Sequence, residues 1–213
     1  MVFLLWVAFF VFGMFLIQGG GIMSIITIIL GHPAKKSYCL ALAESYRYGA
    51  EKSGHSVHLL NLADLDFDPM LHSASNGMRE LEPDLQYAQK LITESDHLVV
   101  IHPLWLGMMP ALLKGFFERV FTPGFAYDNK GHSWPKPLLK GRTARVVITM
   151  GMPAIIYRWV FGAHSFKAMK SNMLKLFGFS PVRVTYLGMV DAVSDKKRKN
   201  WLDKMHHLGA KGK

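Results

Sequence analysis

From Met23 onward, short apolar runs alternate with longer segments in which apolar residues recur at helical spacing. The first run, Ser24–Leu30, is almost continuously apolar and rich in β-branched residues, which is typical of a central strand in a parallel sheet. Five such runs predict strands, at Ser24–Leu30, His55–Leu60, His97–Ile101, Arg142–Thr149 and Val182–Leu187.

The segments between these runs predict five helices and three loops. Pro83 is typical of a first helical position, and Gly178 is typical of a helix end. The predicted helices are Ser37–Lys52, Pro83–Glu94, Pro110–Phe121, Ser165–Phe177 and Ser194–Leu208. The predicted loops are Asn61–Glu82, Thr122–Lys140 and Met150–His164, of which the last has room for a helical turn.

Strands that alternate with helices imply βαβ units and a parallel sheet in an α/β domain. A dinucleotide-binding sheet should carry a GxGxxG turn after its first strand. Here that turn reads GHPAKKS over residues 31–37 and has no glycine triplet. We therefore expect the other common doubly wound arrangement, a five-stranded parallel sheet of order 2-1-3-4-5.

The length and composition of the chain indicate a single domain. The chain has 213 residues, of which 50% are apolar and 19% charged, so it suffices for one sizeable core and extended disorder is not expected. Its single cysteine, Cys39, excludes an internal disulfide, and neither paired cysteines nor an HExxH motif indicates zinc. Asp64, Asp66 and Asp68 alternate in a loop without the spacing of a calcium-binding loop. No metal site is predicted.

The formal net charge is +10, and many lysines follow residue 195. Such a charge favours anionic partners, whether nucleotide phosphates, nucleic acid or an acidic membrane surface. The alternative interpretation is a solvated basic helix end. Nucleic-acid binding is not expected, because no basic stripe interleaved with aromatic residues is present.

Residues 1–22 form an apolar N-terminal extension ahead of the domain at residues 23–213. Residues 1–17 carry no charge and approach the length of a membrane-spanning helix, without the charged start and cleavage site of a secretory signal. Three interpretations stay open: translation starts at Met23, the segment is a membrane anchor, or it is an apolar arm that packs on the domain or a partner.

The turn after the first strand is a candidate phosphate site. The predicted helix that follows begins near Ser37, and free N–H groups at a helix N-terminus bind anions. Lys35 and Lys36 add positive charge, and His32 can donate from its ring. The alternative is an ordinary capped helix with solvated lysines.

The turns after the third and fourth strands would lie beside this site. Trp105, Leu106 and Met108 offer a flat apolar wall that suits an aromatic ring system, although Trp105 could instead be a core anchor. Gly151 in the next turn allows close backbone approach. Two further residues, Tyr157 and His164, could donate a proton to a reduced ring, or could be ordinary structural residues.

Three motifs in this region resemble one family. They are Pro103-Leu104-Trp105, the run MPALLKGFFERVF over residues 109–121, and Pro123-Gly124-Phe125-Ala126-Tyr127. Together they are similar to the flavodoxin-like NAD(P)H:quinone oxidoreductases, which include mammalian DT-diaphorase, bacterial quinone reductases and ancillary subunits of glutathione-gated potassium efflux systems. The resemblance covers about Met23 to Leu208 and implies a flavodoxin-like three-layer sandwich.

The resemblance also implies a non-covalent flavin, FAD or FMN, with NAD(P)H as co-substrate, in a homodimer whose active sites lie at the subunit interface. It places flavin phosphates at His32, Ser37, Tyr38, Cys39 and Ala41, and the flavin ring at Pro103, Leu104, Trp105 and Leu106. Thr149, Met150, Gly151 and Met152 match a Thr-Thr-Gly-Gly turn in which Met replaces the second Thr and the second Gly. Tyr157 and His164, the latter after a one-residue shift, match residues implicated in proton handling.

The resemblance therefore implies an enzyme, an NAD(P)H dehydrogenase (quinone) that transfers two electrons through the flavin by a ping-pong reaction. The alternative is an ancillary, regulatory flavoprotein subunit of a glutathione-gated potassium efflux transporter. A one-electron carrier is less consistent with the basic tail and the long loop after the third strand. We expect a cytoplasmic protein, with membrane association through residues 1–17 as an alternative.

Overall fold

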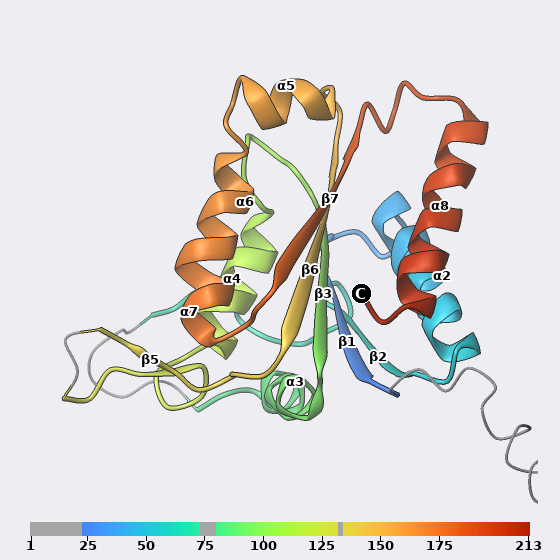
Figure 1. The fold of residues 1–213 in the computed structure, drawn as a ribbon. Coiled ribbons are helices and arrows are strands. Elements are labelled where there is room, and N and C mark those ends of the chain that lie inside the picture. Colours follow the sequence, from blue (N-terminus) through green and yellow to red (C-terminus); the bar gives the residue numbers. More distant parts are fainter. Residues whose placement is uncertain (1–22, 73–79, 132–133) are drawn as a thin grey trace, which may run out of the picture.

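The computed structural model describes residues 23–72, 80–131 and 134–213, and the extension at residues 1–22 lies outside this part. Figure 1 shows three layers, with α2 and α8 on one face of a twisted sheet and α4, α6 and α7 on the other. The sheet strands are β1 (Ile25–Leu30), β2 (Ser56–Asn61), β3 (His97–Pro103), β6 (Thr143–Met150) and β7 (Val182–Gly188). The helices are α2 (Tyr38–Lys52), α3 (Pro83–Glu94), α4 (Ala111–Val120), α5 (Ala154–Trp159), α6 (His164–Ala168), the π-helix η1 (Met169–Leu174), α7 (Lys175–Phe177) and α8 (Asp195–Ala210).

The five strands pair in the order β2-β1-β3-β6-β7, and every pair is parallel. Counted along the chain within this sheet, the order is 2-1-3-4-5, so the predicted arrangement is confirmed. The labels differ because β4 (Tyr127–Asp128) and β5 (Lys136–Pro137) form a separate antiparallel pair inside the predicted loop. All five strand C-termini meet at one edge, which positions the turns that follow them.

Two apolar cores lie on the two faces of the sheet. Alternate residues of a strand point to opposite faces, so neighbouring residues of β3 divide between the cores. Val100 packs with α3, α4 and the α6–α7 region, whereas Val99 and Ile101 pack with α2 and α8. Both faces of the central strands are therefore covered, which explains their continuous apolar sequence.

Helices α2 and α8 pack closely because each carries a glycine at the contact. A Cβ atom on Gly49 would lie 2.1 Å from the carbonyl oxygen of His206, and one on Gly209 would lie 2.0 Å from that of Tyr46. No side chain fits at either position without moving a backbone. The two helices run in the same direction, since Tyr38 contacts Arg198 near both N-termini and Tyr46, farther along α2, reaches Lys213 just beyond the end of α8.

Two local features differ from the predicted elements. Residues 154–159 form α5 within the predicted 150–164 loop, where a helical turn was expected. The predicted helix Ser165–Phe177 is interrupted by six residues of π-helix.

Over residues 23–72, 80–131 and 134–213, the structure holds no helix that is both long and apolar enough to span a bilayer.

Candidate active site

Three turns meet at the C-terminal edge of the sheet, and direct contacts join them. The His32 ring of the first turn packs edge-on against the Trp105 ring, with centroids 5.4 Å apart. Leu104 N donates to Thr149 O at 2.7 Å, and Cys39 Sγ lies 3.3 Å from Thr149 Oγ1. The sequence placed its candidate site at these three turns, and the structure brings them together.

The first turn ends in a capped helix. Ser37 is the N-cap of α2, and its hydroxyl accepts a hydrogen bond from Leu40 N at 3.2 Å. The N–H groups that open an α-helix have no partner within the helix, so an anion can bind them. Lys35 and Lys36 are exposed beside them, and Lys35 forms an exposed ion pair with Asp64 at 3.5 Å.

The other predicted phosphate-binding residues of α2 are engaged within the protein. The Tyr38 hydroxyl donates to Arg198 O at 2.9 Å, and burial raises the pKa of Tyr38 to about 12. Burial raises the pKa of the Cys39 thiol to about 11, so the thiol stays protonated. Ala41 has an exposed side chain, and its N–H donates to Ser37 O. Of these three residues, only Cys39 is in contact with another of the turns.

The third-strand turn is a tight hairpin that exposes apolar side chains. Trp105 and Met108 exchange two backbone hydrogen bonds of 2.9 Å, and both central residues have positive φ, 49° at Leu106 and 79° at Gly107. A leucine in this region is strained, and such strain is concentrated at functional sites. The Leu106 side chain is fully exposed and Trp105 is 47% exposed, so Trp105 is not buried beneath the loop as a core anchor.

Backbone hydrogen bonds join the fourth-strand turn to the segment after β7. Met189 N donates to Met152 O at 3.1 Å, and Val190 N donates to Met150 O at 3.2 Å. Thr149 and Met150 are buried, whereas Gly151 is exposed. A Cβ on Gly188 would lie 2.4 Å from Ala154 N, so this close approach requires glycine. Nothing in the sequence pattern around Gly188 indicated its contact with the turn.

Tyr157 and His164 come together above the end of β6, with ring centroids 6.2 Å apart. Tyr157 is buried, and its hydroxyl oxygen accepts a hydrogen bond from Phe166 N at 3.3 Å. Burial raises the pKa of Tyr157, so the hydroxyl keeps its proton at neutral pH. His164 Nδ1 lies 2.9 Å from the carbonyl oxygen of Phe161. A Cβ built on Gly107 would lie 3.4 Å from His164 Nε2, so the second ring nitrogen faces the third-strand turn.

His102 is a fully buried group near the end of β3. Its Nδ1 lies 2.8 Å from Pro103 O, and because a carbonyl only accepts, Nδ1 carries the proton. Burial lowers the pKa of His102 to about 4, so the ring is neutral. Its Nε2 has no hydrogen-bond partner in the part of the chain that the structure describes. An unpaired acceptor therefore lies directly before the candidate ring site at residues 103–106.

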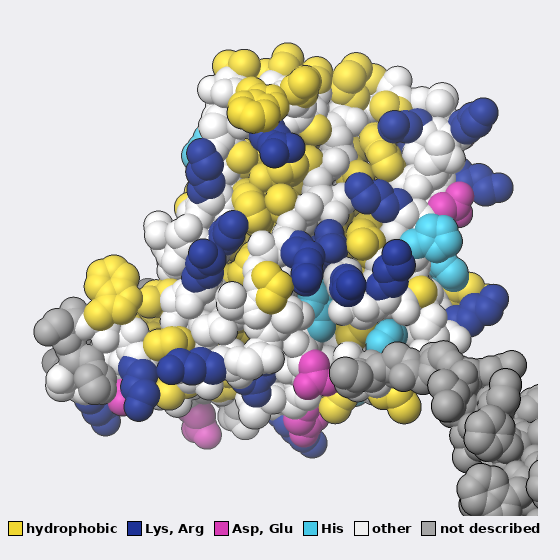
Figure 2. Space-filling model, viewed as in Figure 1, with side chains coloured by type: hydrophobic (Ala, Val, Ile, Leu, Met, Phe, Trp, Pro, Cys, Tyr) yellow, Lys and Arg dark blue, Asp and Glu magenta, His cyan; other side chains and the backbone are white. Residues whose placement is uncertain are grey.

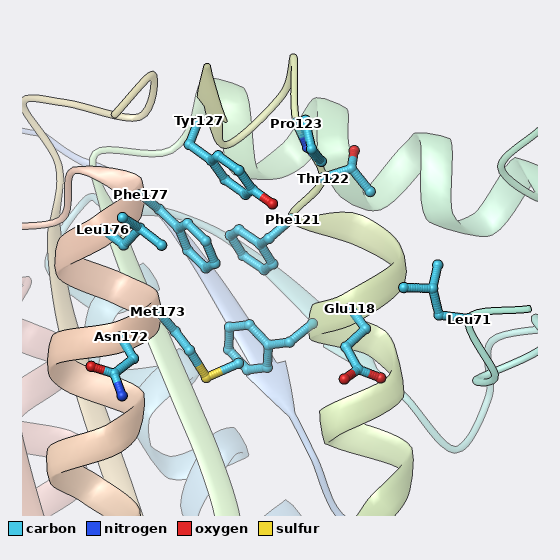
Figure 3. Close-up of a pocket in the computed structure, with 11 residues that line it drawn as sticks. Leu71, Glu118, Phe121, Thr122, Pro123, Tyr127, Asn172, Met173, Leu176 and Phe177 are labelled. Carbon is cyan, nitrogen blue, oxygen red and sulfur yellow. The ribbon is translucent and has the colours of Figure 1, made fainter. Parts of the chain in front are cut away.

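A separate apolar pocket lies at the opposite end of α4 from these turns. Figure 3 shows aromatic side chains that converge on it from α4, α7 and the segment before β4. Its volume is about 320 Å³, and it can hold a flat apolar group. The lining residues are Leu71, Phe117, Glu118, Phe121, Thr122, Pro123, Tyr127, Asn172, Met173, Leu176 and Phe177.

Apolar side chains are also exposed beside the three turns. Figure 2 shows hydrophobic atoms gathered at the end of the molecule that carries α5. The exposed residues there are Ile155, Ile156, Trp159, Val160 and Phe161. We call this group, with Leu106, the apolar rim. A patch of this kind marks a surface that another molecule covers.

Among the described residues, no three His, Cys, Asp or Glu side chains are grouped to hold a metal ion.

Comparison with known proteins identifies relatives of this chain. Residues 24–208 match the family model described as a flavodoxin-like fold. An uncharacterized NAD(P)H oxidoreductase of Haemophilus influenzae is 28% identical over 185 residues, which cover 83% of this chain and 89% of that protein. NAD(P)H dehydrogenase (quinone) 1 of Cavia porcellus is 32% identical over 151 residues, 61% of this chain and 54% of that enzyme. The match thus spans about half the length of the guinea-pig enzyme.

Solved structures show the same fold. Smu.1420 from Streptococcus mutans superposes with a TM-score of 0.77 at 30% identity, over 87% of this chain and 98% of that one. An FMN-dependent NADH-azoreductase from Bacillus anthracis, solved in complex with FMN, has a TM-score of 0.68 at 17% identity, over 88% and 98% of the two chains. The potassium-efflux ancillary protein KefG of Yersinia enterocolitica is 41% identical over only 75 residues, 35% of this chain and 38% of that protein.

Proposed function

Because the chain belongs to the family of proteins with a flavodoxin-like fold, we propose that it is a flavin-dependent NAD(P)H:quinone oxidoreductase. The observation that carries the proposal is the direct contact among the three turns at the C-terminal edge of the sheet. Ligands of open α/β sheets bind in this place. The oxidoreductase and quinone dehydrogenase names of the curated relatives support the same reaction class.

The residues at the three turns fit a flavin. The N-terminus of α2, with Ser37, Lys35 and Lys36, would hold the phosphate, because its N–H groups and charges favour an anion. The half-exposed side chain of Trp105 would pack on the apolar face of the flavin ring. The backbone of residues 149–152 would bind the polar edge of the ring. Met150 and Met152 bring no side-chain hydroxyl or amide, so polar contact at those positions rests on the backbone. FMN and FAD share the phosphate and ring that these residues fit.

A bound flavin supplies two-electron redox chemistry, with a hydride taken from NAD(P)H and two electrons passed to an acceptor. The protein supplies position, apolar surroundings and protons. The Tyr157 hydroxyl holds a proton at neutral pH, and His164 Nε2 faces the third-strand turn. These two groups would provide or remove protons, while Trp105 and Leu106 would favour flat, weakly polar acceptors such as quinones.

We further propose that a second copy of the chain covers the apolar rim, so that two active sites lie at a homodimer interface. Residues 23–213 would form the single domain of each subunit. The cytoplasm is the proposed compartment, since the single Cys39 is a free thiol. The enzyme is preferred to a regulatory transporter subunit because the match to KefG covers only a third of the chain.

Enzyme assays on the purified full chain test the proposal. NADH or NADPH should be oxidised only when a quinone and FMN or FAD are present, with parallel-line kinetics typical of a ping-pong reaction. Trp105→Ala should weaken flavin binding, whereas Trp134→Ala should not, because Trp134 is exposed in the segment between β4 and β5. Absence of NAD(P)H oxidation with both flavins and several quinones would refute the function.

A further inference from the structure

Tyr157 is attached to the start of α6 through both its backbone and its side chain. Helix α5, which carries Tyr157, lies at the end of the molecule next to α6 (Figure 1). The Tyr157 carbonyl oxygen accepts from Ala163 N at 2.9 Å, and its hydroxyl oxygen accepts from Phe166 N at 3.3 Å. Ala163 has a positive φ of 50°, and strain of this kind is concentrated at functional sites. The attachment is therefore a candidate functional contact.

Ser165 lies between these two attachment points. It is 1% exposed, and its Oγ has no hydrogen-bond partner in the part of the chain that the structure describes. A helix serine often donates to the carbonyl oxygen four residues earlier. Here that oxygen belongs to Phe161 and accepts from His164 Nδ1 at 2.9 Å. Unpaired buried hydroxyls are rare, so that of Ser165 needs an explanation.

The Tyr157 oxygen is an acceptor within reach of this hydroxyl. Phe166 N, which donates to the oxygen, is bonded to the carbonyl carbon of Ser165. Burial is the largest influence on the pKa of Tyr157 and raises it, whereas the Phe166 N–H and the Ser165 hydroxyl lower it. A hydrogen-bond donor that lowers the pKa of a phenol favours the charged form. The Ser165 hydroxyl therefore stabilises the phenolate more than the neutral phenol.

The other titratable groups around Tyr157 are placed differently. The rings of His164 and Tyr186 pack against the Tyr157 ring, with centroids 6.2 and 5.6 Å away. His164 directs Nε2 toward the third-strand turn. Arg158, which follows Tyr157 on α5, is exposed. A negative charge on the tyrosine oxygen would therefore be held chiefly by the donors of α6.

We propose that Ser165 is a positioning residue: its hydroxyl turns toward Tyr157 and, with the Phe166 N–H, holds the negative charge left when Tyr157 gives up its proton. The inference rests on the proposed function, in which Tyr157 is a proton donor. In this step the O–H bond of Tyr157 breaks, and the proton goes to the quinone oxygen that receives electrons originating from NAD(P)H. A proton from water later restores the tyrosine.

The physical advantage is that the hydrogen bond strengthens when it is needed. Rotation about the Cα–Cβ bond of Ser165 re-aims the hydroxyl without any change in the backbone. Hydrogen bonds to a charged oxygen are about twice as strong as those to a neutral one. Interactions that are stronger in the transition state than in the ground state increase the rate. Ser165 would therefore act on the rate of proton transfer and not on substrate binding.

Kinetics of Ser165 variants in the full chain test this role, with NADPH, a quinone and FMN or FAD. Ser165→Ala should lower kcat by about tenfold or more, as expected when a hydrogen bond to a charged group is lost. The KM for the quinone should stay within about twofold, because the hydroxyl acts on Tyr157 and not on the substrate. Ser165→Thr keeps the hydroxyl and should retain most of the wild-type kcat.

Two comparisons exclude a merely structural effect. In a chain that carries Tyr157→Phe, adding Ser165→Ala should change kcat by less than about twofold, because no phenolate forms. Ser95→Ala is the matched control, since Ser95 is 2% exposed and its hydroxyl donates to Ile92 O at 3.0 Å just before β3 begins. This control removes a buried hydroxyl at the opposite edge of the sheet from the three turns and should leave kcat unchanged.

The pKa of Tyr157, measured without flavin, separates this inference from the proposed function. The probe is ¹⁹F NMR of the full chain with 3-fluorotyrosine at its tyrosine positions, and Tyr157→Phe assigns the signal. Ser165→Ala should raise the pH at which this signal titrates by about one unit or more, whereas Ser95→Ala should not change it. Thermal unfolding checks that each variant is folded.

Two results would overturn the inference. One is an equal titration of Tyr157 in wild type and Ser165→Ala. The other is a loss of kcat in Ser165→Ala that is the same with and without the Tyr157 hydroxyl. A wild type that oxidises no NAD(P)H would refute the proposed function, while the titration would still decide whether Ser165 acts on Tyr157.

Discussion

Two buried histidines, His97 and His102, should make the folding free energy depend on pH. Burial lowers the pKa of each to about 4, and neighbouring Arg145 and Arg183 add to the effect on His97. In the unfolded chain the same groups titrate near 6.5. Their contribution to stability is therefore full above pH 6.5 and falls as the pH drops toward 4, because the unfolded state binds the extra protons.

Denaturant unfolding at pH 7.5 and pH 5.0 measures this effect. Each histidine should account for about 2 kcal/mol of lost stability at pH 5.0. His97→Gln should lower stability at pH 7.5 but reduce the further loss on acidification. His58→Gln is the control, because that side chain is only half-buried and lies in the edge strand β2. An equal loss in wild type and His97→Gln would show that His97 is not the cause.

Removal of the Tyr157 hydroxyl tests its proposed role in proton handling. Tyr157→Phe should lower the rate of NAD(P)H oxidation by about 10- to 1000-fold, because a positioned proton donor is lost. Tyr186→Phe is the matched control, since its ring packs 5.6 Å from that of Tyr157 in the same aromatic cluster. Unchanged stopped-flow rates in Tyr157→Phe, with both variants folded, would remove the role.

At the scale of elements, the contact between α2 and α8 depends on two glycines. Gly209→Ala forces a Cβ against the Tyr46 carbonyl oxygen and should destabilise the domain by about 1–3 kcal/mol, even though alanine favours helix. Asn200→Ala on the exposed side of α8 should change stability by less than about 0.5 kcal/mol. Thermal or denaturant unfolding distinguishes the two. A neutral Gly209→Ala would mean that the helices move apart easily.

Local patterns predicted the strands and main helices because the buried elements carry continuous or periodic apolar residues. α5 was expected only as a turn within a loop, since Ile155 and Trp159 are exposed and give no core-facing period. The two-residue strands β4 and β5 are too short for any period. The contact between Gly188 and Ala154, and the unpaired Nε2 of His102, depend on residues brought together by the fold, so no local signal could reveal them.

For the whole molecule, the apolar rim predicts self-association. Light scattering on the purified chain should give about twice the subunit mass of 24.0 kDa, because a second copy would bury the rim. Trp159→Lys with Val160→Lys should shift the protein toward monomer and lower quinone reductase activity if each site needs its partner. Leu5→Asp with Phe9→Asp is the control, because it adds charges to the apolar extension and leaves the rim unchanged. This variant should remain a dimer.

The candidate site was predictable from sequence at the level of the turns that form it. Strand topology places the turns after β1, β3 and β6 at one edge, so His32, Trp105 and Thr149 could be grouped in advance. The conformation of each side chain could not be predicted from the sequence, because it depends on partners that are distant along the chain. The Tyr38 hydroxyl is bound by Arg198, 160 residues away, and Tyr157 accepts from Phe166 on the next helix.

Flavin binding is the most direct test of the account. The purified chain, incubated with FMN or FAD and freed of excess, should retain one flavin per subunit by absorbance and native mass spectrometry, and Trp105→Ala should retain less. The retained flavin should bleach when NADH or NADPH is added. A folded chain that retains neither flavin would contradict the claim that the three turns form a flavin site.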